Sequence, residues 1–391
     1  GADAVAAATT WASTNQNGAN SIILGTTTTK TVIAGTATNA DGAVAIGAGA
    51  QATESSVALG VDAQALNKTS TAVGFQTKAL GEYSVALGSG ATAEGKLAYA
   101  MGNNALARDY DVALGAGALN GSTSSTWTTA VGSEAGAGSS STKSTFLGAA
   151  AGTGSSGSFN AYTGWGAGGN VAGNRNVATG LGAGVAVTGD NNVSIGTQAG
   201  STLPLDANGA PPTVITVDMV NTYSDAVNIG SKTKALVHSA VAIGQSASVV
   251  RGSGPAPDFV GPDYHVGGIA IGKNAQVTHS LVTLPDGSTV NPYIGDYASM
   301  AIGANAQAHY GGETIIGGYA GQGAKRYVPS TGVVEPYEGS QSLMVGGNAG
   351  RDSQYFYATF VGDEAGRGSV GEHNAYVGQN AGRFRVGDNN T

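Results

Sequence analysis

Ser56-Val57-Ala58-Leu59-Gly60 returns almost unchanged as Ser84-Val85-Ala86-Leu87-Gly88 and as Asp111-Val112-Ala113-Leu114-Gly115. Related segments recur about every 14 residues between these copies, and the same kind of ending reappears far along the chain, at Gly244 and Gly303. A fixed period this short is typical of a solenoid in which each repeat forms one coil. We therefore expect a rod of stacked coils rather than a globular domain.

Aligning the repeats on their closing glycine reveals two columns of apolar residues along a short strand. The branched column, directly before the glycine, contains Ile46, Leu59, Leu87, Leu114, Ile195, Ile243, Ile271 and Ile302. The small column, one residue earlier, contains Ala45, Ala58, Ala72, Ala86, Ala100, Ala113, Ala242, Ala270 and Ala301. Since strand side chains alternate, the two columns lie on opposite faces. We assign the branched column to the core of each coil.

The small column then forms an apolar stripe along the outside of the stack. Such a stripe is larger than the exposed patches that monomers tolerate, and small residues allow two backbones to approach closely. We therefore expect the small column to pack identical chains side by side in a closed, symmetric oligomer. The alternative is a monomer whose core is rich in alanine.

A second class of coil is 16 residues long. Its mark is Ala-Gly at the third and fourth positions after the closing glycine, as in Ala135-Gly136. In these coils the small column often becomes aromatic, at Phe146, Tyr162, Phe360 and Tyr376. The additional length indicates a wider turn, with glycine supplying positive φ.

The two classes of coil, and the insertions between them, predict the domain organisation. Residues 1–36 form a cap with degenerate first coils, 37–200 a first β-roll, and 227–321 a second β-roll. Insertions occupy 201–226, the neighbourhoods of 250–266 and 280–297, and 322–342, while 16-residue coils fill 343–391. The last residues stop inside a repeat, so we interpret the chain as a piece of a longer protein.

Composition excludes several classes of function. Only 11% of the residues are charged and 41% are hydrophobic, which argues against disorder. A net charge of -8 argues against a nucleic-acid partner, because phosphates are neutralised by clustered Lys and Arg. Cysteine is absent, so disulfides and cysteine-bound metals are excluded. No apolar stretch is long enough for a membrane-spanning helix.

We also find no motif for catalysis, a cofactor or a metal. Gly152-Thr153-Gly154-Ser155-Ser156-Gly157 fits a dinucleotide-binding pattern but opens no helix, and the five histidines are scattered. We therefore expect no enzyme activity and no cofactor. One alternative is a secreted or phage-type β-solenoid that degrades polysaccharides, although the 25 acidic residues are dispersed. Another is an ice-binding solenoid, although the run Thr26-Thr27-Thr28-Thr29 is not repeated.

The tandem segments resemble the YadA-like head repeat of trimeric autotransporter adhesins over most of residues 40–391. Val57-Ala58-Leu59-Gly60, Val241-Ala242-Ile243-Gly244 and Ile269-Ala270-Ile271-Gly272 carry this resemblance. It implies a left-handed parallel β-roll, all-β, assembled as a side-by-side homotrimer at the distal tip of a fibre on a bacterial surface. It also implies a stalk and an outer-membrane anchor elsewhere in the parent chain.

The resemblance further implies a non-enzymatic adhesin that attaches to host matrix proteins of the collagen, fibronectin or laminin class, to abiotic surfaces or to other cells. No family binding residue is transferred, because the 16-residue coils and the insertions depart from the family pattern. Insertions in solenoids emerge as loops, often on the binding face. The candidate ligand-contact residues are Arg251, Asp258, Tyr264, Tyr293, Lys325, Arg326, Tyr327 and Tyr337. The same loops could instead brace neighbouring chains.

Overall fold

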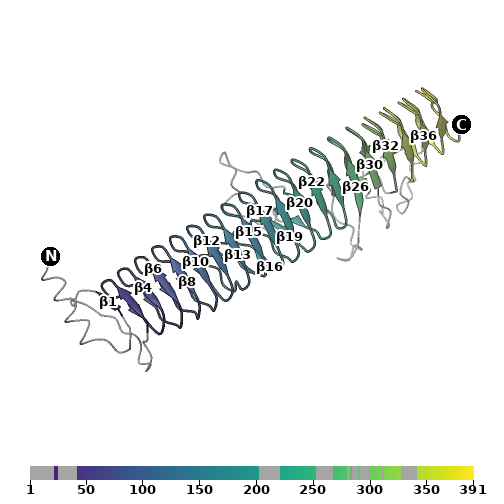
Figure 1. The fold of residues 1–391 in the computed structure, drawn as a ribbon. Helices are drawn as coiled ribbons and strands as arrows, with labels where there is room; N and C mark the ends of the chain where they lie inside the picture. Colours follow the sequence, from purple (N-terminus) through teal and green to yellow (C-terminus); the bar gives the residue numbers. More distant parts are fainter. Residues whose placement is uncertain are drawn as a thin grey trace. The chain divides into compact units, whose positions relative to one another are not determined.

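A computed structural model shows that the chain divides into two compact units, residues 1–176 with 206–211 and residues 177–205 with 212–391. The structure describes residues 22–24, 42–201, 221–251, 267–279, 282–283, 289–290, 299–309, 312–326 and 341–391. Within these ranges both units consist of short strands joined by turns, without helices (Figure 1).

In the first unit, each coil contributes one strand to a parallel main sheet. Its strands are β1 (Ile22–Leu24), β2 (Val44–Ile46), β4 (Val57–Leu59), β6 (Thr71–Val73), β8 (Val85–Leu87), β10 (Tyr99–Met101), β12 (Val112–Leu114), β13 (Thr129–Val131), β15 (Thr145–Leu147) and β17 (Ala161–Thr163). A second parallel sheet contains β3 (Gln51–Ala52), β5 (Gln64–Ala65), β7 (Lys78–Ala79), β9 (Thr92–Ala93) and β11 (Leu106–Ala107). In the longer coils, β14 (Ser140–Thr142) pairs with β16 (Ser156–Ser158).

The second unit repeats this plan. Its main sheet contains β18 (Val177–Thr179), β20 (Val193–Ile195), β22 (Val227–Ile229), β24 (Val241–Ile243), β26 (Gly268–Ile271), β30 (Ser299–Ile302), β32 (Thr314–Ile316), β34 (Leu343–Val345), β36 (Thr359–Val361) and β38 (Ala375–Val377). The other face carries three smaller parallel sheets. The first pairs β19 (Val187–Thr188) with β21 (Asn221–Thr222), and the second contains β23 (Lys234–Ala235), β25 (Ser248–Arg251), β27 (Gln276–His279) and β31 (Gln307–Ala308). The third contains β33 (Lys325–Arg326), β35 (Gln354–Phe356) and β37 (Val370–Glu372). A short antiparallel pair joins β28 (Val282–Thr283) to β29 (Thr289–Val290).

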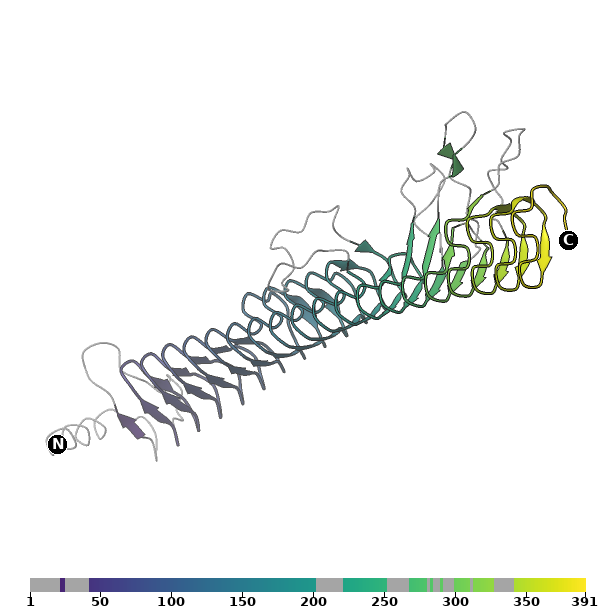
Figure 2. The ribbon, with the colours of Figure 1, turned by 90° about the horizontal axis from the view of Figure 1, so that it is seen from above.

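Within each unit, successive coils are joined by backbone hydrogen bonds between equivalent strands, which hold equivalent residues in register. Ala58 pairs with Ala72 and Ala72 with Ala86, so each sequence column becomes a physical row. The equivalent strands lie side by side in both views (Figure 1, Figure 2). The predicted all-β parallel solenoid is therefore confirmed.

The core contains the small column, and the prediction that placed the branched column there is wrong. Ala45, Ala58, Ala72, Ala86, Ala100, Ala113, Ala242, Ala270 and Ala301 are all at most 2% exposed within a single chain. Residues of the branched column point outward instead, and Ile46 and Ile195 are 37% and 40% exposed. The two strands of a coil pack closely, and the second strand also directs alanines such as Ala65 inward. In the 14-residue coils of the first unit so narrow a space accepts methyl groups, not branched side chains. In the second unit the interior also accepts Val249, Val277 and Ile315, which are at most 1% exposed.

The longer coils have a wider interior, which aromatic rings fill. Phe146 and Tyr162 are fully buried and stack at 5.5 Å between ring centroids. This packing explains the Ala-Gly pair of these coils. A Cβ on Gly152 would lie 2.5 Å from Cδ1 of Phe146, so the glycine leaves the space that the ring occupies.

Candidate functional site

The outer face of the main sheet carries an exposed apolar stripe in each unit. In the first unit its most exposed members are Ile46, Tyr99, Val131 and Leu147. In the second unit they are Val177, Ile195, Ile229, Ile316, Leu343 and Val377. Contiguous apolar surface of this kind marks an interaction site in soluble proteins. The face that is free to contact a partner is thus the one that carries the branched column and the residue two positions before it, and the small column is not available.

An aromatic row follows the turn that precedes the main-sheet strands of the first unit. The aromatic members Tyr83, Tyr110, Trp127 and Phe159, and the aliphatic Leu97 among them, occupy the same turn position with φ between 54° and 61°, and all are at least 36% exposed. Each backbone N–H donates to a carbonyl of the preceding coil, as Tyr110 does to Lys96 at 2.9 Å. Bulky residues at positive φ are uncommon, and the hydrogen-bond ladder holds them there.

Contacts between neighbouring coils order this row further. The rings of Tyr110 and Trp127 stack with centroids 4.2 Å apart, and the ammonium of Lys143 lies 5.2 Å from the centroid of Phe159. Aromatic side chains ordered in this way present apolar area at a low entropic cost. The row is therefore a second exposed surface suited to contacts.

Ion pairs between adjacent coils accompany the aromatic row. Lys68 pairs with Glu54 at 3.6 Å, and Lys96 pairs with Glu82 at 3.3 Å. The hydrogen bond and the charge of Glu82 raise the pKa of Lys96. Exposed pairs of this kind contribute little stability, but they neutralise the charges along this turn.

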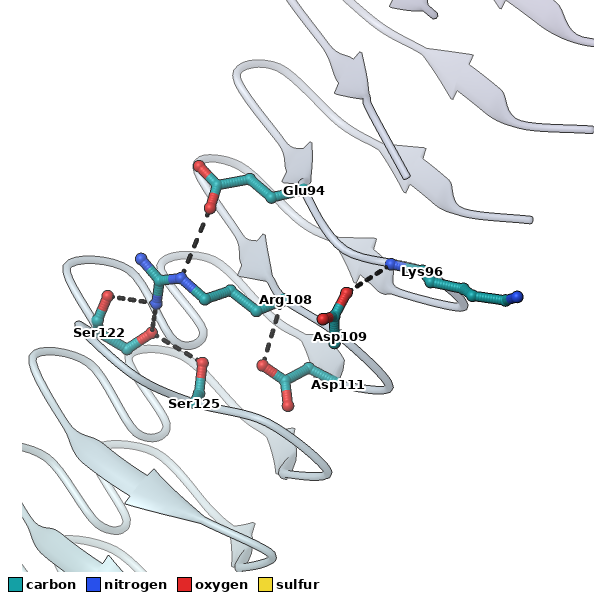
Figure 3. Close-up of polar contacts among 7 residues, drawn as sticks. All are labelled: Glu94, Lys96, Arg108, Asp109, Asp111, Ser122 and Ser125. Atoms are coloured by element: carbon teal, nitrogen blue, oxygen red, sulfur yellow. Dashed lines mark hydrogen bonds and ion pairs between the residues drawn. The ribbon is translucent and has the colours of Figure 1, made fainter. Parts of the chain in front are cut away.

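Asp111 is a fully buried carboxylate at the junction between short and long coils (Figure 3). Its Oδ2 accepts the backbone N–H of Arg108 at 3.1 Å, and its Oδ1 accepts that of Thr128 at 2.8 Å. Burial raises the pKa of Asp111, because desolvation outweighs these hydrogen bonds. The side chain serves main-chain donors across two coils, so its role is structural.

Arg108 extends this junction to both neighbouring coils. Its guanidinium pairs with Glu94 at 3.5 Å and donates to the carbonyl oxygen and the hydroxyl of Ser122, which contacts Ser125 at 3.1 Å. These contacts fix the first turn of the longer coil (Figure 3). The arrangement is a polar link that joins three successive coils.

Glu313 occupies the corresponding position in the second unit, four residues before a closing glycine, and is also fully buried. Its Oε2 accepts the backbone N–H of His309 at 2.8 Å, and its Oε1 accepts the hydroxyl of Tyr355 at 2.6 Å. Sequence reasoning missed both acids. The available signal was an acidic residue in a column that otherwise contains Ser, Thr, Asn, Ala or Gly, next to a change in coil length.

The predicted ligand-contact residues are only partly described. Lys325 is exposed on β33, where Arg326 pairs through its main chain with Tyr355, and Arg251 pairs through its main chain with His279. Asp258, Tyr264, Tyr293, Tyr327 and Tyr337 lie outside the described residues. Their role in binding remains a prediction.

The described part of the chain contains no group of three or more His, Asp or Glu residues that could hold a metal ion. The same residues include no helix that is long and apolar enough to cross a bilayer.

Comparison with known proteins identifies the repeat of the first unit. Residues 54–75 and 65–91 each match the YadA head domain repeat, while no curated protein matches the chain. The matched residues span β4, β5, β6, β7, β8 and the coils that join them. Residues 54–91 thus match two copies of the YadA head repeat, and over this stretch the resemblance to the YadA-like head of a trimeric autotransporter adhesin is confirmed.

Proposed function

We propose that this chain is the non-enzymatic head of a trimeric autotransporter adhesin, displayed at the tip of a fibre on a bacterial cell surface. The observation that carries this proposal is the pair of YadA head repeats within a parallel β-solenoid. Solenoids of this type offer long repeated surfaces and loops rather than one deep pocket. Attachment is the function that such surfaces support best.

The proposed assembly is a homotrimer that packs through the branched column. Ile46, Leu147 and Ile195 expose a third or more of their surface in a single chain, whereas the alanines are already buried. Closed cyclic symmetry would cover the stripe equally on every copy. The exposed apolar stripe supports this choice of face because it would otherwise remain in contact with water.

The proposed targets are host matrix proteins of the collagen, fibronectin or laminin class, abiotic surfaces and other cells. Three chains per fibre and many fibres per cell would multiply weak contacts into firm attachment. The exposed aromatic row of the first unit is a suitable contact surface, because Tyr and Trp are enriched at binding hot spots.

Adhesion of the full 391-residue chain tests this proposal. The chain, fused to a trimeric coiled coil, is displayed on beads and applied to immobilised collagen, fibronectin, laminin, polystyrene and bead-bound copies of itself. We expect adhesion to at least one surface above that of beads with the coiled coil alone. Beads that adhere to none of them would overturn the proposal. Release of reducing sugars from polysaccharides by the same chain would then favour an enzyme.

A further inference from the structure

The first unit contains a polar groove of about 530 Å³ that runs along its second sheet. One wall is formed by Gln51, Gln64, Lys78 and Thr92, which project from β3, β5, β7 and β9. Their strand neighbours are buried alanines, so the alternation of each strand sends the polar side chain outward. The volume of the groove lies within the range of small-ligand sites in proteins.

The opposite wall is formed by the turn that follows each closing glycine. Asp62 and Gln76 occupy this turn with φ of 55° and 54°, and their side chains line the groove. Gly49 and Gly90 occupy the same turn position in the flanking coils and carry no side chain. The wall is thus lower at both ends, which suits a ligand that runs along the groove and leaves it at either end.

The amide and charged side chains of the groove are not used by the fold, whereas the hydroxyl of Thr92 donates to the carbonyl oxygen of Gly90 at 3.3 Å. Among the described residues, the side chains of Gln51, Gln64, Gln76, Asp62 and Lys78 make no hydrogen bond and no ion pair. On the neighbouring turn, by contrast, the charged residues pair between coils. A glutamine amide donates and accepts hydrogen bonds, so the groove offers both kinds of partner at successive coils about 4.8 Å apart.

These groups favour an uncharged, hydroxyl-rich ligand. Asp62 and Lys78 bring one charge of each sign, so the groove has no net charge to attract an anionic or a cationic chain. An extended peptide that adds a strand is disfavoured, since β5 and β7 are already paired on both sides and present no free edge. Phe75 precedes Gln76 in the same turn and is 51% exposed, which supplies an apolar ring for contact with a sugar.

We propose that this groove binds a linear, uncharged glycan through Gln51, Gln64, Gln76, Asp62 and Lys78. The inference rests on the proposed adhesin function and names a ligand class for it. An open groove lined by amides binds one glycan segment weakly. Presentation on several chains then raises the overall avidity, as for the other contacts of an adhesive fibre.

A glycan array that contains neutral and acidic linear glycans tests the proposal with the full chain displayed on the trimeric coiled coil. The best neutral hexasaccharide is then titrated against the chain by calorimetry. The matched control is the double variant Gln198→Ala and Gln276→Ala, which removes glutamines at the same repeat positions of the second unit, outside this groove. We expect Gln64→Ala with Gln76→Ala to weaken binding about tenfold or more, and the control to bind like the wild type.

Three results would overturn the proposal: binding to no neutral glycan, binding to acidic glycans alone, or equal binding by the wild type and the Gln64→Ala/Gln76→Ala variant. Circular dichroism of each variant separates loss of the groove from loss of the fold. A chain that adheres to a matrix protein but fails on neutral glycans loses only the glycan proposal. A chain that adheres to nothing loses the adhesin function as well.

Discussion

Asp111 shows how one side chain joins coils of different length. In the shorter coils this position holds serines such as Ser84, whose hydroxyl donates to Gly81 O within the same turn at 2.7 Å. The longer side chain of Asp111 instead accepts the N–H of Thr128, in the following coil, as well as that of Arg108. Glu313 also joins its own turn to a later coil, but its carboxylate accepts the N–H of His309 and the side-chain hydroxyl of Tyr355.

We expect Asp111→Ala to lower the free energy of unfolding by about 1–3 kcal/mol, because the buried N–H of Thr128 and the half-buried N–H of Arg108 lose their acceptor. Asp111→Asn keeps one acceptor and carries no charge, so it should lower the free energy of unfolding less than Asp111→Ala does. The pKa of Asp111 is raised in the folded state, so folding favours its protonated form and this carboxyl stabilises more as the pH falls. Urea unfolding should therefore show that the free energy of unfolding of the wild type, relative to that of Asp111→Asn, is higher near pH 4 than at pH 7. An unchanged difference would contradict this reading.

Two buried tyrosines allow a matched test of how much a hydrogen-bond partner matters to a buried hydroxyl. The hydroxyl of Tyr162 has no hydrogen-bond partner among the described residues, and burial raises its pKa. The hydroxyl of Tyr223 donates to the carbonyl oxygen of Gly200 at 2.6 Å. We expect Tyr162→Phe to stabilise the fold by about 1 kcal/mol and Tyr223→Phe to destabilise it by about the same amount. Thermal melts measure both, and equal losses would show that Tyr162 is also bonded.

At the scale of strands and turns, periodicity predicted the positions of the elements but not which face is buried. The strand Val57–Leu59 lies where the repeat places it, directly before a closing glycine. Alternation separates Ala58 from Val57 and Leu59, yet both faces are apolar, so the pattern alone does not select the inner one. The selection depends on the distance between the two strands of a coil. That distance is a property of the turns and is not encoded in the alternation.

The spacing within a coil also limits how far the aromatic interior and the polar groove could be predicted from the sequence. The aromatic residues at Phe146 and Tyr162 were visible as a column, but their burial depends on the wider coil. The polar groove arises where a turn residue, Gln76, comes close to a strand residue of the same face, Gln64. Neither residue departs from the repeat, so the sequence carried no separate signal for the groove.

The closing glycines should be the least replaceable residues of the turns. A Cβ on Gly132, with φ of 135°, would lie 2.5 Å from the carbonyl oxygen of Gly148 in the next coil. Gly138 also has positive φ, but its Cβ would meet nothing within 4 Å. We expect Gly132→Ala to cost about 3 kcal/mol or more and Gly138→Ala about 1 kcal/mol. Denaturant midpoints compare the two, and similar losses would contradict the role of close coil packing.

At the scale of the whole molecule, the branched column determines whether chains assemble. Val131 and Leu147 are 36% and 40% exposed on the main sheet of the first unit. In the proposed homotrimer, Val131→Glu with Leu147→Glu would bury unpaired charges on every copy, and this cost is large. Val61 and Phe75 are even more exposed, at 45% and 51%, but lie off the main-sheet strands. Val61→Glu with Phe75→Glu is therefore the matched control.

Light scattering after gel filtration measures the molar mass of the assembly directly. We expect the wild type and the control variant to have about three times the chain mass of 38.1 kDa, and the Val131→Glu/Leu147→Glu variant to be a monomer with an unchanged circular dichroism spectrum. A charge on the outer face is tolerated by a single chain, since that face is already open to water. If the Val131→Glu/Leu147→Glu variant is still a trimer, the interface lies elsewhere on the chain. A monomeric wild type at micromolar concentration would mean that the exposed stripe alone does not hold the chains together.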